Sequence, residues 1–310
     1  MKEKVIFIAE AGVNHNGSIA KAKKLIDGAV QARADYVKFQ TFDADKLTSP
    51  LTPKAHYQKK NIKNKKFISQ HKMLKNLQLS IKDHYILKKY AKKKGIKFLS
   101  SAFDVNSLRF LSKLKVDYIK IPSGEIDNIP YLEAVGKLNK KTILSTGMST
   151  MSEIINATNM LKKSGLSMKK LTVLQCNTEY PSPLKDANIK AMLTIKEKLK
   201  VDIGYSDHTL GNEAIYAAIA LGAKVIEKHF TLNKNDKGPD HLASATVKQL
   251  KEIIETSKNI LKALGTNIKK PSNSEKKNIN IIRRKIYSSK PIKKGEIFTI
   301  QNLIPLRSQK

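Results

Sequence analysis

The sequence predicts an α/β fold: a (β/α)₈ TIM barrel, followed by a linker and part of a small β-rich module. Three observations lead to this prediction. Eight short β-branched runs recur over about the first 230 residues, amphipathic segments separate them, and the composition changes near residue 265. Strands that alternate with helices pair in parallel, and eight such units in about 250 residues are typical of a closed barrel. A doubly wound sheet is the alternative.

The predicted strands are residues 5–11, 34–42, 96–103, 118–123, 142–147, 171–177, 201–207 and 223–230. Helical periodicity marks the segments 19–33, 81–94, 151–163, 212–221 and 246–264, where apolar residues recur every three or four positions. The connection 43–80 is unusually long for a barrel loop. Long loops are usually functional, so we expect this one to cover the substrate above the barrel.

After the barrel domain, residues 1–265, the chain becomes polar. Residues 266–279 contain Pro271 and several Ser and Lys residues, and are predicted to be a linker. Residues 280–310 hold two short apolar runs around Lys294-Gly295, which predict the start of a β-rich module. This segment has too few residues to close a core alone.

Composition limits the cell compartment and the fold. Of the 310 residues, 40% are hydrophobic, which is enough for a large core. No apolar stretch approaches 18 residues, so we expect no membrane span, and the first apolar run ends at Glu10, too soon for a signal peptide. The one cysteine, Cys176, excludes an internal disulfide and is expected to be a small buried thiol. Cytoplasmic location follows as the default.

The net charge of +33 suggests nucleic-acid binding as one hypothesis. Only five of the 59 basic residues are arginine, however, and lysine is spread over nearly every polar segment. Nucleic-acid surfaces usually favour arginine, whose planar fork matches phosphate and guanine. An AT-rich genome would produce the same lysine excess, so we expect no specific nucleic-acid partner. The positive field would still attract an anionic substrate.

Polar residues gather at the predicted C-terminal strand ends, where barrel enzymes carry their chemistry. Lys38 and Lys120 lie inside two different strands that reach the same mouth. A buried lysine needs an anionic partner, so two of them favour a phosphate or carboxylate ligand. Two alternatives stay open: pairing with barrel carboxylates such as Glu10 or Glu227, and Schiff-base chemistry.

His208 and His229 end the seventh and eighth predicted strands, which are neighbours in a barrel. Two imidazoles at that spacing can bind one divalent ion and leave its other positions to water or substrate. Two hydrogen-bonded rim histidines without a metal are the alternative.

Together these strand ends resemble the N-acetylneuraminate (sialic acid) synthase family, which includes legionaminic and pseudaminic acid synthases. The resemblance spans the barrel and continues into the C-terminal segment, and its motifs stand in the family's order. The matching stretches are residues 8–17, 37–41, 120–125, 144–148, 180–183, 204–209, 227–231 and 238–240.

The resemblance implies a role for each matching residue. His208 and His229 match the ligands of a divalent ion, Mn²⁺ or Mg²⁺. Residues that match phosphoenolpyruvate ligands or their neighbours are Lys38, Lys120, Ser206, Ser123 and Thr146. Residues that match sugar contacts or pocket walls are Glu10, Tyr180, Asp240, Ser101 and Phe103. Glu125 matches the acid/base residue.

The implied reaction condenses phosphoenolpyruvate with an N-acylated amino sugar and water, giving a nine-carbon nonulosonic acid and phosphate. C3 of phosphoenolpyruvate attacks the sugar aldehyde, which the metal polarises, and water then adds to C2 with help from Glu125. Lys38 and Lys120 stabilise the phosphate by preorganised charge. Because no covalent enzyme intermediate is needed, the mechanism argues against a Schiff-base aldolase using Lys120.

The acceptor is either N-acetylmannosamine or a diacetylated relative. Residues 177–180 differ from the Thr-Asn-x-Tyr form of N-acetylmannosamine enzymes and resemble the legionaminic type. Bacterial cell-surface polysaccharide synthesis is the expected setting for either acceptor.

The C-terminal segment departs from the family pattern. Family members carry a complete SAF (antifreeze-like) module, whose arginine, followed by Pro-Gly, reaches the partner's site in a swapped homodimer. Arg307 matches that arginine, but Ser308-Gln309-Lys310 follow it, so we expect residues 280–310 to be a truncated module. An inactive barrel that acts only as a basic binding protein is therefore an alternative to the synthase.

Overall fold

The computed structural model describes residues 5–61 and 69–307, apart from the side chains of His56 and Lys60. The chain divides into two compact units, Met1–Leu264 and Gly265–Lys310. Two predicted segments lie partly outside the described residues: residues 62–68 of the covering connection, and Ser308-Gln309-Lys310 of the expected module.

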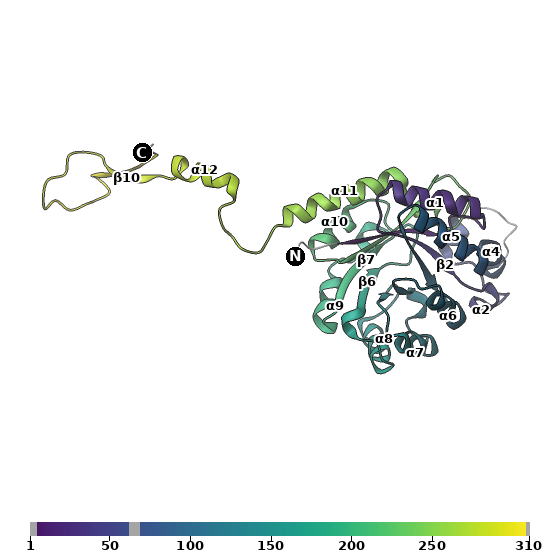
Figure 1. The fold of residues 1–310 in the computed structure, drawn as a ribbon. Helices are drawn as coiled ribbons and strands as arrows, with labels where there is room; N and C mark the ends of the chain where they lie inside the picture. The colour runs from purple at the N-terminus through teal and green to yellow at the C-terminus, as the bar shows by residue number, and fades with distance from the viewer. Residues whose placement is uncertain (1–4, 62–68, 308–310) are drawn as a thin grey trace. The chain divides into compact units, whose positions relative to one another are not determined.

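The first unit is built on eight parallel strands that pair in chain order, and β1 pairs with β8, so the sheet closes on itself (Figure 1). This confirms the predicted (β/α)₈ barrel and excludes the doubly wound alternative. The strands are β1 Ile6–Gly12, β2 Tyr36–Thr41, β3 Lys97–Ala102, β4 Ile119–Ile121, β5 Thr142–Ser145, β6 Leu171–Cys176, β7 Asp202–Asp207 and β8 Val225–Thr231. A two-residue strand, β9 (Ala245–Thr246), continues beside β8.

Helices follow the strands and bury one apolar face each against the barrel. They are α1 Ile19–Gln31, α5 Ile81–Lys93, α6 Val105–Lys113, α7 Ile129–Leu138, α8 Met151–Lys163, α9 Ala191–Leu199, α10 Glu213–Ala220 and α11 Val247–Leu264. The first residues of α5 and α8 are fixed by capping boxes, Ser80 with Asp83 and Thr150 with Glu153. No helix among the described residues is long and apolar enough to cross a membrane.

The long connection after β2 holds three short helices, α2 (Ala44–Leu47), α3 (His56–Asn61) and α4 (Gln70–Leu77). Met73 and Leu77 of α4 pack with Val13 and Phe42 into a small apolar cluster, separate from the main core. This cluster attaches α4 to the strand ends of β1 and β2, so the described part of the connection lies at the mouth of the barrel.

The second unit has helix α12 (Asn273–Ile282) and an antiparallel pair, β10 (Lys285–Ser288) with β11 (Leu303–Leu306). Helix α12 starts inside the segment predicted to be a linker, because Ser272 and Glu275 form a capping box that the polar composition concealed. The apolar side chains of this unit are largely solvent-exposed; Phe298 is 69% exposed and Ile300 is 89% exposed. Its identity as a truncated SAF module stays a prediction.

The remaining short elements shape the loops. They are the 3₁₀ turns η1 Ser123–Glu125, η2 Met168–Lys170, η3 Leu184–Asp186 and η4 His241–Ala243.

Candidate active site

The carboxyl ends of the barrel strands surround one cavity of about 640 Å³. Successive side chains of a strand point to opposite faces, so each strand aims alternate residues at the barrel interior. All eight strands place a side chain in the cavity wall: Glu10, Lys38, Ser101, Lys120, Ser145, Cys176, Ser206, and both Glu227 and His229. Most of these side chains are charged or polar, which indicates a ligand site rather than a core.

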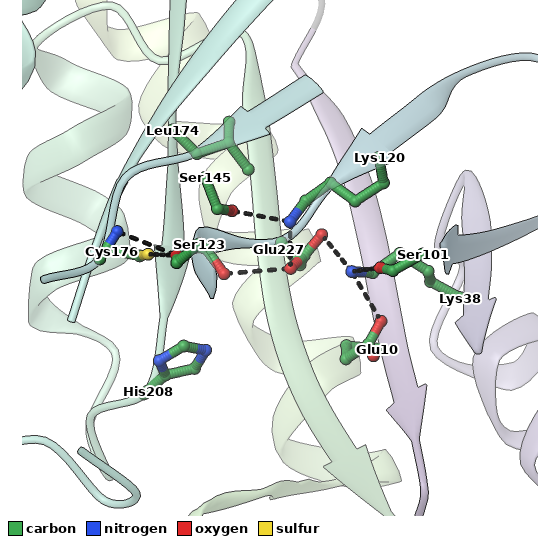
Figure 2. Close-up of polar contacts among 12 residues, drawn as sticks. Glu10, Lys38, Ser101, Lys120, Ser123, Ser145, Leu174, Cys176, His208 and Glu227 are labelled. Carbon is green, nitrogen blue, oxygen red and sulfur yellow. Dashed lines mark hydrogen bonds and ion pairs between the residues drawn. The ribbon is translucent and has the colours of Figure 1, made fainter. Parts of the chain in front are cut away.

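Two lysines and two glutamates form a buried network at the floor of this cavity (Figure 2). Lys38 Nζ lies 3.2 Å from Glu10 Oε2 and 3.0 Å from Glu227 Oε2. Lys120 Nζ lies 3.5 Å from Glu227 Oε1. Pairing with the carboxylates, one of the open alternatives, is therefore present, but the same ammonium groups also line the cavity.

Hydrogen bonds use only part of what these ammonium groups can donate. Lys38 donates to Ser101 Oγ over 3.0 Å, and Lys120 donates to Ser145 Oγ over 2.7 Å. Neither Glu10 Oε2 nor Glu227 Oε2 accepts a well-aligned hydrogen bond from the described residues, although both lie within 3.2 Å of Lys38 Nζ. An ammonium group has three N–H donors, so both lysines can turn a donor toward an anionic ligand.

Burial separates the two carboxyl groups in pKa. Burial raises the pKa of Glu10 to about 8, and the attraction of Lys38 does not offset it. Burial also acts on Glu227, but the charges of Lys120 and Lys38 outweigh it and lower its pKa to about 2. Glu227 is therefore the more acidic of the two carboxyl groups, and it lies between the two ammonium groups. Burial lowers the pKa of Lys120, and a bound anion would favour its charged form.

The two histidines predicted to bind metal lie side by side at this mouth, with ring centroids 5.4 Å apart. His208 Nδ1 donates to the backbone oxygen of Asn177, which leaves its Nε2 lone pair free. His229 Nδ1 is buried and has no hydrogen-bond partner among the described residues. Gly12 turns with φ +51° against this ring, where a Cβ would lie 3.1 Å from His229 Cε1.

These two imidazoles fit a divalent ion. Burial lowers the pKa of His208 to about 4 and that of His229 well below its usual range, so both are neutral and offer lone pairs at pH 7. No group of three or more His, Cys, Asp or Glu side chains is arranged to hold a metal in the part of the chain that the structure describes. The protein would thus offer two nitrogen ligands to such an ion, and substrate or water would complete the coordination.

Glu125 reaches the cavity from the 3₁₀ turn η1 after β4. The side chain is 7% exposed, and its Oε2 accepts a hydrogen bond of 2.6 Å from Asn128 Nδ2. Burial raises the pKa of this carboxyl group, which is the property required of an acid/base residue near neutral pH.

A stack of rings joins the far side of the mouth to His208. The ring centroids of Tyr180 and His208 are 4.0 Å apart, and Tyr57 of α3 lies 4.8 Å from Tyr180. Asn61, also on α3, donates to the backbone oxygens of Tyr180 and Pro239 over 3.1 and 2.7 Å. The described part of the long connection is thereby tied across two strand-end loops beside the cavity, and its role in covering the substrate stays a prediction.

Asp240 completes this side of the cavity, just before η4. Burial raises the pKa of its carboxyl group to about 7. It is therefore suited to donate or accept a hydrogen bond with a substrate hydroxyl.

The structure brings together twelve of the fourteen residues predicted for the site. These are Glu10, Lys38, Ser101, Phe103, Lys120, Ser123, Glu125, Tyr180, Ser206, His208, His229 and Asp240. Thr146 does not join them, because its Oγ1 donates to the backbone oxygen of Leu174 and the residue borders a different hollow. Arg307 belongs to the second unit, where it is exposed, and its predicted contact with a partner's site stays a prediction.

The cavity residues without an assigned role in the sequence interpretation include Ser145, Gln40 and Tyr57. Ser145 occupies the place expected for Thr146; the stretch Ser145-Thr146-Gly147 alone does not tell which hydroxyl points inward. Gln40 shares the inward face of β2 with Lys38, and strand alternation was the available signal. Tyr57 lies in the long connection, and no pattern in the sequence marks it.

A search against protein families matches the NeuB family over residues 25–269, which is most of the barrel.

The similar proteins include two with the same name. The N,N'-diacetyllegionaminic acid synthase of Campylobacter jejuni is 50% identical over 98% of this chain and 91% of its own length. The protein of that name from Legionella pneumophila is 43% identical over 97% of this chain and 84% of its own length. The crystal structure of N-acetylneuraminic acid synthetase from Leptospira borgpetersenii superposes with a TM-score of 0.79 and 34% identity, covering 90% of this chain and 91% of that one.

Proposed function

This chain belongs to the NeuB family, and on that premise we propose that it joins phosphoenolpyruvate to a diacetylated amino sugar. It is a transferase of the sialic acid synthase type that forms a carbon–carbon bond. The products are a nonulosonic acid and phosphate. A legionaminic-type acceptor is preferred because the two similar synthases described above carry that name.

The observation that carries the proposal is the pair of buried lysines at the cavity floor. Lys38 and Lys120 come from different strands, line the same cavity and both lie against Glu227. A buried cationic site with unused donors requires an anion, and phosphoenolpyruvate supplies both a phosphate and a carboxylate.

The residues around the lysines have separate tasks in binding phosphoenolpyruvate. Ser101 and Ser145 each accept a hydrogen bond from one lysine and so hold the two ammonium groups in place. Ser206 Oγ lies 3.1 Å from Glu227 Oε1, beside the same anion site. Preorganised donors of this kind stabilise the phosphate as it leaves, without reorganisation during the reaction.

The carbon–carbon bond forms between C3 of phosphoenolpyruvate and the aldehyde carbon of the open-chain sugar. His208 and His229 would hold the divalent ion, Mn²⁺ or Mg²⁺, which supplies Lewis-acid polarisation of the aldehyde oxygen. Water then adds to C2, and Glu125 acts as the general base that accepts a proton from this water. The tetrahedral intermediate collapses, its C2–O bond to the phosphate breaks, and phosphate is expelled.

The acceptor has both polar and apolar neighbours in the cavity. Tyr57, Tyr180 and Asp240 offer hydroxyl and carboxyl groups to its hydroxyls. The cavity is also lined by an apolar cluster, which includes Phe42, Phe103, Val13, Met73 and Leu77. Apolar walls suit methyl groups, and a diacetylated sugar carries two acetyl methyls, one more than N-acetylmannosamine.

Three further features belong to the proposal. Reaction in the cytoplasm suits the use of phosphoenolpyruvate, a central metabolite. A homodimer in which Arg307 reaches the partner's site rests on the family resemblance of the C-terminal segment. The product's role in cell-surface polysaccharide follows from the nonulosonic acid chemistry.

The test is an acceptor panel. Purified protein is incubated with phosphoenolpyruvate and Mn²⁺, together with N-acetylmannosamine or the diacetylated precursors of legionaminic or pseudaminic acid. We expect equal amounts of phosphate and new keto acid, fastest with the legionaminic precursor, and none after chelation. The surface variant Lys97→Met serves as the matched control for Lys38→Met, which should form no product.

Two results would overturn the proposal. No product from any of the three acceptors would contradict the synthase activity of this chain. Product that resists chelation, together with borohydride trapping of a keto acid on Lys120, would favour the Schiff-base aldolase instead.

A further inference from the structure

A second buried charge pair lies on strands β7 and β8, directly beside the two histidines but outside the cavity. Asp207 and Lys228 are cross-strand partners in register, 1% and 2% exposed, and their ion pair measures 2.5 Å. His208 follows Asp207 in the chain, and His229 follows Lys228. One ion pair therefore joins the two positions that immediately precede the histidines.

The Lys228 ammonium group also donates hydrogen bonds to the backbone on the C-terminal side of His208. Besides Asp207 Oδ2, it donates to the backbone oxygen of Thr209 over 2.5 Å and to that of Gly211 over 3.3 Å. Asp207 Oδ1 in turn accepts from the Thr209 backbone N–H over 3.0 Å. All three N–H donors of Lys228 are used, and each goes to an oxygen atom within residues 207–211.

A contribution to folding stability does not by itself explain this buried ion pair. Replacing a buried ion pair by apolar residues is often neutral or stabilising, since both charges lose their hydration. An apolar side chain at position 228, however, could not hold two backbone oxygens. The charge pair is therefore best explained by the conformation that it imposes on residues 207–211.

We propose that Asp207 and Lys228 are positioning residues for the histidine pair: the Lys228 ammonium group holds residues 207–211 against β8 and thereby sets the separation of His208 and His229. Neither residue borders the cavity, so neither is a catalytic residue. The inference rests on the proposed metal role of the two histidines. Loss of the pair is expected to weaken metal binding while the barrel stays folded.

The decisive variant is the double substitution Lys228→Met/Asp207→Asn, which removes both charges and leaves no unpaired ion. Mn²⁺ affinity is measured directly, by the loss of the free-ion EPR signal on titration, without substrates. We expect the dissociation constant to rise about 10- to 100-fold, the range found when residues that orient metal ligands are replaced. Lys228→Arg, which keeps a charged donor, should recover part of the affinity.

Two controls separate positioning from general damage. Lys97→Met/Asp117→Asn removes the Lys97–Asp117 ion pair of 2.9 Å, which is exposed and distant from the cavity lining, and should leave Mn²⁺ affinity unchanged. Leu161→Ala removes a buried side chain of α8 and should lower the melting temperature without changing Mn²⁺ affinity.

A folded double variant that binds Mn²⁺ with wild-type affinity overturns the positioning role. If the double variant does not fold, Asp207→Asn alone is judged by the same titration. If the wild-type protein binds no Mn²⁺, the metal part of the proposed function fails. The crystal structure of the variant then decides: ring centroids of His208 and His229 still 5.4 Å apart would overturn the positioning proposal by themselves.

Discussion

The barrel wall has buried charges on both of its faces, contributed on the inner face by β2, β4 and β8 and on the outer face by β7 and β8. The charged groups of the two faces are satisfied by hydrogen bonds to different degrees. On the inner face, Lys38 and Lys120 each donate one well-aligned hydrogen bond to a serine and otherwise make ion pairs around Glu227. On the outer face, Lys228 has an acceptor for each of its three N–H groups. Ser206 donates a hydrogen bond to Glu227 on the inner face. The residues that follow them, Asp207 and Lys228, form their ion pair on the outer face.

This difference indicates that the inner buried charges serve ligand binding and the outer ones serve the structure of the barrel. A fully satisfied ammonium group has nothing left to offer a ligand, whereas a partly satisfied one beside a cavity does. The inner lysines should therefore govern activity more than stability. The outer lysine should govern stability and the geometry of the histidines.

The largest effect is expected from Lys120→Met on the inner face. We expect kcat/KM to fall at least about 10³-fold, because a preorganised donor to the phosphate is lost. The free energy of unfolding should fall by less than in Lys228→Met, because Glu227 keeps its ion pair with Lys38 when Lys120 is removed. Steady-state phosphate release and urea denaturation measure the two quantities.

Lys97→Met, a substitution of a largely exposed lysine of β3, is the control and should match wild type in rate. A Lys120→Met variant that keeps the wild-type rate would remove the distinction between the two faces.

The second largest effect is expected on the outer face, where a substitution should change folding stability more than on the inner face. Lys228→Met leaves the Asp207 carboxylate buried without its cation, and breaking such a pair costs about 3–5 kcal/mol of folding stability. Urea denaturation compares this variant with Lys120→Met. Equal stability of the two variants would show that inner and outer lysines are not energetically different.

Glu125→Gln tests whether Glu125 acts in proton transfer rather than in anion binding. The amide keeps a hydrogen bond with Asn128 but cannot exchange a proton, so kcat should fall about 10²- to 10³-fold. The KM for phosphoenolpyruvate should stay close to wild type, because Glu125 is not among the anion ligands. Glu153→Gln, at the exposed cap of α8, is the matched control. A large rise in KM with unchanged kcat would instead place Glu125 in binding.

The smallest effect concerns pH and Asp240. Burial raises its pKa to about 7, above the value of about 3.9 in an unfolded chain. The stability contributed by the bound proton is therefore full below about pH 3.9 and is lost as the pH rises through about 7.

Asp240→Asn carries no such proton, so it should gain about 2–3 kcal/mol relative to wild type between pH 5 and pH 8. Urea denaturation at the two pH values measures the gain. A difference between wild type and variant that does not change with pH would contradict the raised pKa.

Sequence periodicity predicted most of the barrel because its strands and longer helices bury regular apolar faces. The helices α6, α7 and α9 have only nine or ten residues, and they were not individually predicted. Helix α12 was missed for another reason: it buries none of its residues, so it carries no core-facing pattern. A capping box was the available signal there.

The site was predictable where the chemistry of a residue conflicts with its place in a strand. Lys38, Lys120 and the paired histidines are unusual inside a barrel, and so they stand out. Thr146 was predicted in place of Ser145, because neighbouring hydroxyls at a strand end differ only in which face they take. Tyr57 and the Asp207–Lys228 pair depend on contacts between distant segments, which a single sequence does not encode locally.

The most direct test of the proposed reaction follows one oxygen atom. The protein is given Mn²⁺, the diacetylated acceptor, and phosphoenolpyruvate labelled with ¹⁸O in the oxygen that joins C2 to phosphorus. Attack by C3, addition of water to C2 and loss of phosphate from C2 predict that the released phosphate retains the ¹⁸O label. Unlabelled phosphate would mean that the P–O bond breaks, and would contradict the mechanism proposed for the Lys38 and Lys120 site.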